Sequence, residues 1–548
     1  MKRFCQSFLT LFASFLIVQF SKAQTLPTVL STQFKKDTFN IQKFGAVADG
    51  ITLNTKSIND AITACNKNGG GVVLITGGYW LTGPIVLQSN VNLHINRDAV
   101  LQFSSDFNQY PLVDGNWEGL PAVRNQSPIS ANNAENIAIT GSGIVDGNGD
   151  AWRAVKKEKL NETQWKNKIA SGGLLSDDKK TWYPSAKSFK GFQTKEPGVL
   201  KDGKTKKDFE DIKDFLRPNL VVLTNCKRVL LDGITFQNSP AWCLHPLMCE
   251  DLIVRNVYAK NPWYAQNGDG IDIESCKNFI LENSTFDVGD DGICIKSGRD
   301  AEGRKRGKPT ENGIIRKNIV YHAHGGFVIG SEMSGGAKNL YVSNCTFIGT
   351  DVGLRFKTAR GRGGIVENIF VKNINMKDIV GEAILFDMYY MAKDPVPLAG
   401  EIRETPKVEL FPVTEATPQF KNFFVKNIVC DGAEKAILIR GLPEMSIKNI
   451  SLEHLVIKAK KGIDCQDAEN ITIKDLRLVL SETNPVINIR NSNKILFDKL
   501  MFNEGAELLV NVIGEKTDHI KLKNVDLSKA KNKVKADLGA KESSVVIE

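Results

Sequence analysis

The chain has 548 residues, with 71 Lys and Arg against 62 Asp and Glu, so its formal net charge is +9. This basic balance suits nucleic acid, an anionic surface or an anionic polymer as partner. After residue 23 no stretch approaches the roughly 18 to 20 apolar residues of a membrane span, and no cysteine pair has the C-x-x-C spacing of a metal site. Length alone favours several domains, but a solenoid can grow without dividing because each repeat contacts only its neighbours.

Residues 1–23 have the pattern of a secretory signal peptide. Two cations precede an apolar run over residues 8–20, and residues 21–23 (Ser-Lys-Ala) fit a small-x-small cleavage site. Cleavage removes three cations and no acid, so the charge falls from +9 to +6. We therefore expect a protein exported to the periplasm or beyond the cell, without a membrane span and monomeric. For such a protein an anionic polysaccharide is a better-suited partner than nucleic acid.

Residues 24–90 are expected to form an N-terminal strand and capping-helix region. A strand and turn occupy residues 39–50, and Ile58, Ile62 and Cys65 then fall on one face of a helix over residues 54–67. Three glycines at 69–71 end this helix. Because the end of a solenoid exposes apolar core, a single amphipathic helix before a strand series is typical of a cap.

Residues 91–548 are expected to form one repetitive catalytic domain. From Ile137 onward, short strands of alternating apolar residues are interrupted by Asn, Asp or Gly. The interrupting positions lie mostly 21 to 29 residues apart by subtraction, and they are Gly233, Asn256, Asn283, Asn318, Asn344, Asn373, Asn427, His454, Asp475, Lys499 and Asn524. This period, with several strands per repeat, predicts an all-β, right-handed parallel β-helix rather than a sandwich or leucine-rich repeats. At the bends, Asn tolerates the left-handed conformation and can form ladders of side-chain amides.

Two insertions interrupt the repeat, at 150–216 and at 391–419. The first is Lys-rich and contains three tryptophans, and we expect it to lie on the cleft side, either as solvated decoration or as one wall of the cleft. Cys226, Cys276 and Cys345 recur beside the bend positions, as does Cys430. They are expected to be small core residues rather than a disulfide framework, because a chain of this size needs no disulfides to build its core.

Four polar motifs follow one another at intervals of about one coil: Asn267-Gly-Asp269, Gly289-Asp290-Asp291, His324 and Arg355-Phe-Lys357. Successive coils of a β-helix stack about 4.8 Å apart, so these groups are predicted to form one row of roughly 15 Å along one face. Flanking glycines would let the backbone bend enough to bring both Asp290 and Asp291 into the cleft.

Clustered carboxylates at Asp269, Asp290 and Asp291 repel one another, which raises at least one pKa. A protonated and an ionised carboxyl together supply the acid and the base that cleavage of a glycosidic bond requires, and a wide separation leaves room for the water of an inverting reaction. Arg355 and Lys357 point to the same face of a strand, where they would favour a sugar that carries a carboxylate. His324 would orient an acid or contact the sugar.

These motifs, in this order and spacing, resemble family 28 of the glycoside hydrolases, the polygalacturonases. The resemblance implies that Asp290 protonates the leaving oxygen, and that Asp269 with Asp291 activates the attacking water. It implies that the substrate-binding residues are Asn267, Arg355, Lys357 and either Tyr389 or Tyr390, with His324 supporting the acid. Gly268 and Ala323 depart from the usual pattern, which leaves the fine substrate preference open.

The expected reaction is inverting hydrolysis of α-1,4-galacturonosidic bonds in polygalacturonate, without a cofactor or metal. The insertion at 150–216 slightly favours exo action. Three alternatives stay open: a rhamnogalacturonan hydrolase of the same family, a calcium-dependent pectate lyase that would use the acids as ligands, and a glycan-binding β-helix without turnover. The basic residues between 299 and 308 are either a solvated loop or a substrate-attracting patch. We interpret three aromatic residues as packing residues in preference to residues that stack on a sugar. They are Trp242, His245 and Trp263.

Overall fold

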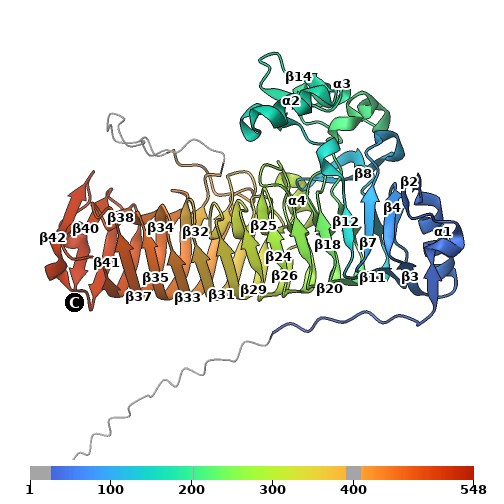
Figure 1. The fold of residues 1–548 in the computed structure, drawn as a ribbon. Helices are drawn as coiled ribbons and strands as arrows, with labels where there is room; N and C mark the ends of the chain where they lie inside the picture. Colours follow the sequence, from blue (N-terminus) through green and yellow to red (C-terminus); the bar gives the residue numbers. More distant parts are fainter. Residues whose placement is uncertain (1–25, 202, 391–408) are drawn as a thin grey trace, which may run out of the picture.

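The computed structural model of the chain describes residues 26–201, 203–390 and 409–548. These residues form an elongated solenoid whose coils succeed one another from the N-terminal (blue) to the C-terminal (red) end (Figure 1). Within the two large sheets, each strand pairs in parallel with the strand one coil later. The fold is the right-handed parallel β-helix that the repeat predicts. The expected signal peptide and residues 391–408 of the second insertion lie outside the described residues.

One 14-stranded parallel sheet runs the length of the solenoid. Its strands are β5 (Ile85–Val86), β10 (Ile129–Asn132), β16 (Val221–Thr224), β19 (Leu244–Leu247), β22 (Ile271–Glu274), β25 (Asp291–Lys296), β28 (Gly325–Ile329), β30 (Leu354–Lys357), β32 (Glu382–Asp387), β34 (Lys435–Arg440), β36 (Lys461–Gln466), β38 (Ile487–Arg490), β40 (Ala506–Ile513) and β42 (Ala530–Asp537). Ile271 pairs with Ile293, and Val328 with Arg355, so the coils stack in register. A 24-stranded sheet forms the other sides.

The 24-stranded sheet bends at residues with left-handed backbone. In the first half, β23 (Lys277–Glu282) and β24 (Thr285–Asp287) flank Asn283, whereas β29 (Ala337–Ile348) runs on through Asn344. The φ angles of these two asparagines are 51° and 55°. Ten of the eleven predicted bend positions have positive φ, which confirms the predicted repeat at those positions.

The prediction is wrong at Asn318. The register pairs Glu282 with Arg316, so Lys317 rather than Asn318 follows at the bend, and its φ is 56°. Asn318 is instead buried, where its Oδ1 accepts a hydrogen bond from the Ser284 N–H at 2.9 Å. In this coil the Asn stands one residue later, relative to the bend, than in the neighbouring coils. Sequence spacing alone could not show that shift.

Asparagine side chains form ladders along the solenoid, as predicted. Asn427 Nδ2 donates to Asn373 Oδ1 at 2.9 Å, and Asn373 Nδ2 donates to Asn344 Oδ1 at 3.0 Å. A second ladder, at 2.7 to 3.5 Å, was not expected; it joins Asn278, Asn312, Asn339, Asn368, Asn422, Asn449 and Asn470. Each rung satisfies amide groups that the bend would leave unpaired.

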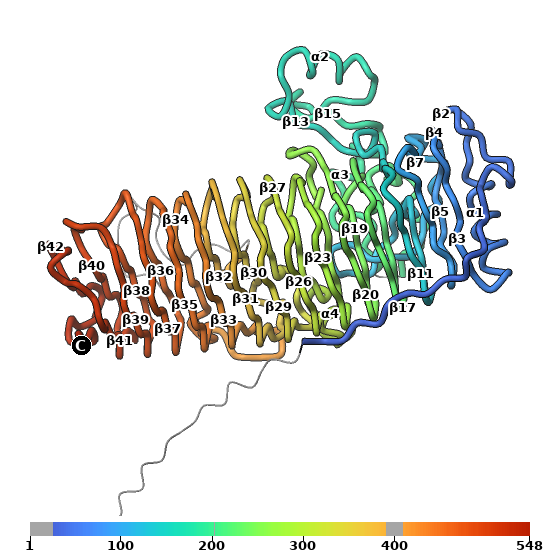
Figure 2. The backbone as a smooth tube through the Cα atoms, turned by 60° about the horizontal axis from the view of Figure 1, so that its bottom comes forward, coloured from blue at the N-terminus to red at the C-terminus, as the bar shows by residue number. Residues whose placement is uncertain are grey.

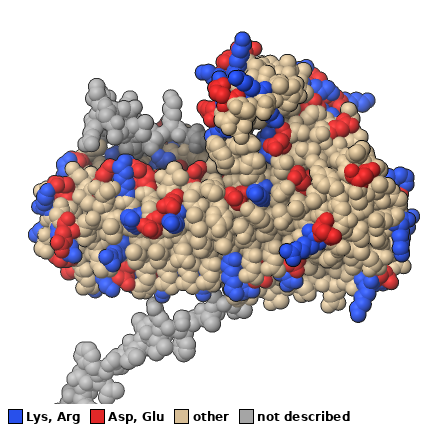
Figure 3. All heavy atoms as spheres, in the orientation of Figure 1, with Lys and Arg blue, Asp and Glu red and all other residues tan. Residues whose placement is uncertain are grey.

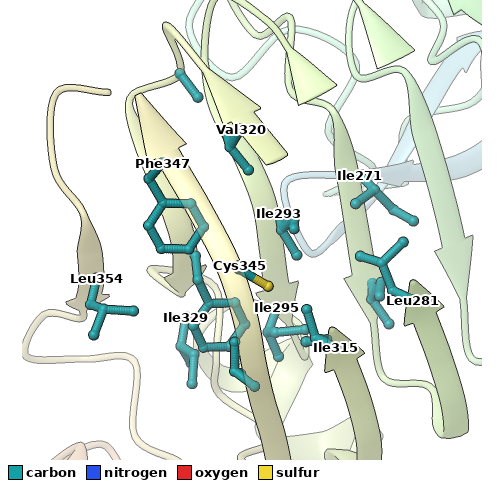
Figure 4. Packing of buried hydrophobic residues seen from close by; sticks show 14 of the residues in the cluster. Ile271, Leu281, Ile293, Ile295, Ile315, Val320, Ile329, Cys345, Phe347 and Leu354 are labelled. Carbon is teal, nitrogen blue, oxygen red and sulfur yellow. The ribbon is translucent and has the colours of Figure 1, made fainter. Parts of the chain in front are cut away.

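A continuous apolar core fills the solenoid. Figure 4 shows Ile293, Ile295 and Phe347 among the side chains of neighbouring coils that pack in the interior. The nine cysteines after residue 25 are all buried free thiols, which confirms that they are core residues. At the N-terminal end lies α1 (Thr55–Lys67), and its buried Ile58, Ile62 and Cys65 join the same core, as the predicted helix requires.

Two further parts lie outside the coils. Residues 150–216 form a lobe that projects from the N-terminal half in Figure 1. It contains α2 (Glu162–Ala170), α3 (Ala186–Gln193) and a small antiparallel sheet of β13 (Val155–Lys156), β14 (Leu174–Leu175) and β15 (Thr181–Tyr183). In Figure 2 the segment after residue 26 runs along the solenoid past β17 (Lys227–Asp232) and β20 (Glu250–Arg255). Across the described parts of the chain, no helix is both long and apolar enough to cross a membrane.

Candidate active site

The three predicted acids meet at the start of neighbouring strands of the 14-stranded sheet. Asp269 precedes β22, Asp290 precedes β25, and Asp291 begins β25. Each carboxylate places one oxygen within 4.8 Å of the other two. This distance joins one oxygen of each carboxylate, so the wide separation of the carboxyl groups expected from the sequence stays a prediction. The sheet brings the acids together because residues about one coil apart occupy the same height on one face.

Gly289 and Gly292 serve close packing rather than an unusual backbone angle. Neither has a positive φ. A Cβ at Gly289 would lie 2.6 Å from the carbonyl oxygen of Pro262, and a Cβ at Gly292 would lie 2.4 Å from the Val320 side chain. The expectation that these glycines let the backbone bend is therefore replaced by a steric reason: only glycine fits between the coils here.

Asp269 and Asp291 are both buried but differ in their surroundings. Asp269 is 3% exposed, and its Oδ1 has no hydrogen-bond partner among the described residues. Burial, followed by repulsion from Asp272 and Asp290, raises the pKa of Asp269 well above its usual value. Burial also opposes ionisation of Asp291, but Lys357 and Arg355 outweigh it and hold the pKa of Asp291 below its usual range.

The expected cations are held by an acid of the site. Lys357 Nζ lies 2.8 Å from Asp291 Oδ2, and Arg355 Nη1 lies 3.2 Å from Asp291 Oδ1. Both cations come from β30, where residues two apart point to the same face, as predicted. Their positive charge is therefore partly compensated before any substrate arrives.

His324 contacts the second acid. Its Nδ1 lies 3.1 Å from Asp290 Oδ1, its Nε2 lies 3.7 Å from Asp351 Oδ2, and its backbone N–H donates to the Asp290 carbonyl at 2.9 Å. The hydrogen bond with Asp290 raises the pKa of His324 above its ordinary value, against the opposing effect of burial. The role expected of His324, orienting an acid, is compatible with this geometry.

Only one of the two candidate tyrosines lies beside the site cations. The ring of Tyr390 has its centroid 4.8 Å from Lys357 Nζ and 5.9 Å from Arg355 Cζ. Tyr389 is 4% exposed and belongs to the core, with its ring between Arg360 and Arg440. Adjacent residues at a strand end point to opposite sides, which is why spacing left the choice open.

Sequence reasoning missed a buried ionic group beneath the acids. Asp272 is 0% exposed, and both its oxygens lack hydrogen-bond partners among the described residues. Lys296 Nζ lies 3.6 Å from Asp272 Oδ1 and 2.8 Å from Glu332 Oε2. Asp272 lies three residues after Asp269 in an alternating strand pattern, and Lys296 is the last residue of an apolar strand. A charged residue within an apolar strand was the only sign of this pair in the sequence.

A second missed residue is Arg217, which follows the insertion at 150–216. Its Nη2 donates to Asn267 Oδ1 at 2.9 Å, and its Nη1 donates to the carbonyls of Gln266 and Pro240 at 2.9 and 3.0 Å. Asn267 itself has left-handed backbone, with φ of 54°. Asn267, predicted to bind substrate, thus also anchors this guanidinium. No sequence signal marks Arg217, because its partner lies 50 residues away.

A β-hairpin crosses the face of the 14-stranded sheet on the N-terminal side of the acids. It consists of β8 (Leu112–Trp117) and β9 (Leu120–Asn125). Trp117 stacks on Trp242 with ring centroids 5.8 Å apart, and Arg299 Nη1 lies 3.3 Å from Glu118 Oε2. The Arg299 N–H also donates to the Gly119 carbonyl at 3.3 Å. We call this hairpin, with its contacts to Trp242 and Arg299, the hairpin wall.

The end of the first insertion packs against the hairpin wall. Phe209, Ile212 and Leu216, at the end of the insertion, form a small apolar cluster with Leu112 and Val123 of the hairpin. The end of the insertion therefore supports the hairpin, and the prediction that the insertion forms one wall of the cleft stays a prediction. Behind the hairpin is a cavity of about 550 Å³ towards β10, β16 and β19.

Among the basic residues at 299–308, Arg304, Lys305 and Arg306 lie in a short helix, and Lys305 and Lys308 are exposed to solvent. In and beside α4 (Asp300–Arg306), Arg306 pairs with Glu274 and Arg304 lies 3.6 Å from Glu415. Trp242 and His245 are buried, as the packing interpretation predicts. Trp263 is exposed, with Lys159 Nζ 4.6 Å from its ring centroid, so it does not belong to the core.

Together, the β-helix and its row of carboxylates define a hydrolase that acts on glycosidic bonds, and comparisons with known proteins agree. The family model described as "Glycosyl hydrolases family 28" matches residues 196–414. A second model, described as "Rhamnogalacturonase A/epimerase, pectate lyase-like", matches residues 38–195. The first of these ranges contains all the predicted site residues.

Relatives and a solved structure extend the similarity over most of the chain. A probable polygalacturonase of Vitis vinifera is 29% identical over 445 residues, covering 78% of this chain and 77% of the relative. An exo-poly-alpha-D-galacturonosidase of Dickeya chrysanthemi is 27% identical over 462 residues, covering 80% and 71%. The crystal structure of a hyperthermoactive exopolygalacturonase from Thermotoga maritima is 30% identical, with a TM-score of 0.64, over 87% of this chain and 94% of that one. The chain belongs to family 28 of the glycosyl hydrolases and is a glycoside hydrolase.

Proposed function

We propose that this protein hydrolyses α-1,4-galacturonosidic bonds of polygalacturonate, with inversion, from one end of the chain. The observation that carries the proposal is the group of three carboxylates with oxygens within 4.8 Å of one another, set beside the cations of β30. Polygalacturonate carries a carboxylate on every sugar, which suits cations beside the scission point. The relatives named above, a galacturonosidase and an exopolygalacturonase among them, support the same substrate.

The attacking water fits between Asp269 and Asp291. A water that donates to two oxygens, each about 2.8 Å away, spans roughly 4.5 Å between them. The carboxylate separation of at most 4.8 Å matches this span. Asp291, kept ionised by its two cations, takes the proton of the water, and Asp269 holds the second hydrogen bond. The water thus attacks the anomeric carbon directly, and the product has inverted configuration.

Asp290 delivers a proton to the leaving oxygen. It is the most accessible of the three acids, and His324 lies 3.1 Å from its carboxylate. The contact raises the pKa of His324, so the protonated imidazole is favoured beside Asp290 and orients its carboxyl group. After each turnover the proton that Asp291 took from the water is released to solvent, and Asp290 takes one from solvent. Tyr390, beside Lys357, completes the side of the site that binds the sugar carboxylate.

Exo action follows from the hairpin wall. A polymer that crosses the acids along the 14-stranded sheet would meet the hairpin on the N-terminal side, where Trp117 stacks on Trp242 and Glu118 pairs with Arg299. An internal stretch of polymer needs an open groove on both sides of the scission point, whereas a chain end needs it on one. We also propose that the protein is exported, in keeping with residues 1–23, and acts as a monomer.

Product analysis tests the proposal. Polygalacturonate and rhamnogalacturonan are incubated with the protein, and the products are separated by anion-exchange chromatography from the earliest time points. We expect only the shortest galacturonate products, no change on adding a chelator, and no ultraviolet absorbance from an unsaturated product. Proton NMR of the first turnover reports the anomer. Release from rhamnogalacturonan alone, or chelator-sensitive formation of an unsaturated product, would contradict the proposal.

A calcium-dependent lyase is disfavoured by the ion pairs of Asp291. A cation bound by the three acids would compete with Lys357 and Arg355 for both oxygens of Asp291. Two positive side chains at 2.8 and 3.2 Å repel a further cation at the same carboxylate. The chelator arm of the product analysis distinguishes the two reactions.

A further inference from the structure

Arg217 is a cation at the site without an acid of its own. Within the described parts of the chain, no carboxylate oxygen lies within 4 Å of its guanidinium, whereas Arg355 and Lys357 both pair with Asp291. Its pKa is lowered to about 10, first by burial and then by repulsion from Arg153. The side chain is half-buried, and Glu118, Asp290 and Asp269 offset part of this lowering without forming an ion pair with it.

The guanidinium is held rigidly with part of its donor capacity free. Of the five N–H hydrogens of an arginine, three donate to the carbonyls of Pro240 and Gln266 and to Asn267 Oδ1. The hydrogen of Nε and the second hydrogen of Nη2 have no acceptor among the described residues. Two adjacent free N–H groups on one guanidinium present the fork that binds a carboxylate with two hydrogen bonds.

Arg217 lies between the hairpin wall and the acids. Its side chain reaches Asn267, two residues before Asp269, and its own carbonyl accepts a hydrogen bond from Arg124 Nε of the hairpin at 3.1 Å. It precedes β16, whereas Arg355 and Lys357 lie on β30, beyond the acids. The acids are thus bracketed by cations, and the one on the enclosed side, Arg217, forms no ion pair within 4 Å among the described residues.

We propose that Arg217 binds the carboxylate of the terminal uronate that the hairpin wall encloses, and so makes the enclosed position specific for an acidic sugar. This inference rests on the proposed function. It assigns the released sugar a recognition residue that is separate from the β30 cations, which contact the sugar on the other side of the scission point.

The test compares two substrates in the wild-type protein, in Arg217→Met and in Arg217→Lys. One substrate is trigalacturonate; the other is the same trimer with a methyl ester on the terminal residue that is released. For the wild type we expect kcat/KM to be roughly 10- to 100-fold higher for the free acid, the worth of a charge-assisted carboxylate contact. In Arg217→Met this preference should disappear, because kcat/KM for the free acid falls while kcat/KM for the methyl ester stays the same. Arg217→Lys should retain part of it.

Arg228→Met is the matched control, because Arg228 pairs with Glu135 on the 24-stranded sheet, away from the acids. An equal fall of activity on both substrates in Arg217→Met would show that Arg217 only positions Asn267, and would overturn the inference. Galacturonate and its methyl ester are also compared by calorimetric binding to each variant. If the wild type hydrolyses neither trimer, the proposed function fails, while this binding comparison still decides for or against the Arg217 contact.

Discussion

Three chemically identical carboxyl groups acquire different properties from their neighbours. Asp291 is ionised because Lys357 and Arg355 lie within 3.2 Å of its carboxylate. The pKa of Asp269 is raised by burial and by the neighbouring acids. Asp290 is the acid that His324 contacts. Such a division into groups with pKa values pushed apart is what acid–base cleavage needs. The difference arises from the residues that contact each acid, and the spacing of the motifs does not reveal these contacts.

Asp290→Asn tests the role of the proton donor. The amide keeps the size and the polar contacts of the side chain but cannot deliver a proton to the leaving oxygen. We expect kcat for reducing-sugar release to fall by roughly 10³-fold or more, with substrate binding retained. Asp287→Asn is the control, since Asp287 pairs with His322 outside the site. Unchanged turnover in Asp290→Asn would refute the mechanism.

Asp272→Asn tests the buried charge beneath the acids. Burial, only partly offset by Lys296, raises the pKa of Asp272 well above its value of about 3.9 in an unfolded chain. A carboxyl group whose pKa is raised by folding contributes stability that is fully present below its unfolded pKa. This contribution to the free energy of unfolding is lost as pH rises through its folded pKa. The asparagine variant has no such loss, so its Tm relative to wild type should increase by a few degrees between about pH 4 and 7. If its Tm is lower by a constant amount at every pH, Lys296 needs Asp272 as a partner.

At the scale of elements, the hairpin of β8 and β9 obstructs one side of the sheet face, which a regular coil of the solenoid cannot do. Coils of a β-helix repeat the same open face, so an obstruction must come from an insertion. Here the insertion is short, and it is fixed at its tip by the Glu118–Arg299 ion pair and by stacking of Trp117 on Trp242. The larger lobe at 150–216 packs against its base.

Removal of the tip contacts should change the mode of action. In the double variant Trp117→Ala and Glu118→Ala, the tip loses both its stacking partner and its ion pair, and the enclosed end opens. We expect oligogalacturonates longer than the wild-type products in early chromatograms, and a larger fall in viscosity per bond cleaved. Asp114→Ala, which removes only the exposed pair with Lys206, is the control. An unchanged product profile with normal activity would show that the hairpin does not set exo action.

At the scale of the molecule, the visible face in Figure 3 shows charge of both signs without one large patch. On the face shown in Figure 3, Lys and Arg alternate with Asp and Glu, and the projecting lobe carries side chains of both signs. The excess of cations, 71 against 62 acids, therefore acts on a polyanion mainly through the whole field of the protein.

This field should make encounter with the polymer sensitive to salt. As ionic strength rises from about 0.05 to 0.5 M, the Debye length falls from about 14 to about 4 Å, and long-range attraction is screened. We expect kcat/KM on polygalacturonate to fall several-fold and kcat to change little, because the paired groups of the site are buried. Digalacturonate carries only two charges, so its kcat/KM should fall less. An equal dependence for both substrates would argue against steering by net charge.

Much of the fold and of the central site was predictable from the sequence. The β-helix follows from a local pattern, alternating apolar residues and Asn-marked bends at a repeated interval, and the interval itself places Asp269, Asp290, His324 and Arg355 in one row. Even so, the shift from Asn318 to Lys317 at one bend needed the actual pairing of strands.

The sequence by itself determined the coil, the row of groups and the chemistry of that row, since each depends on residues about one period apart. Only the tertiary structure decided what lies around the row: Tyr390 rather than Tyr389, the Lys296–Asp272 pair, Arg217 beside Asn267, and the wall in which Glu118 meets Arg299. The last two contacts join residues 50 and 181 positions apart, through insertions of irregular length. A repeat fixes position along the solenoid, but no periodic rule states where an insertion returns to it.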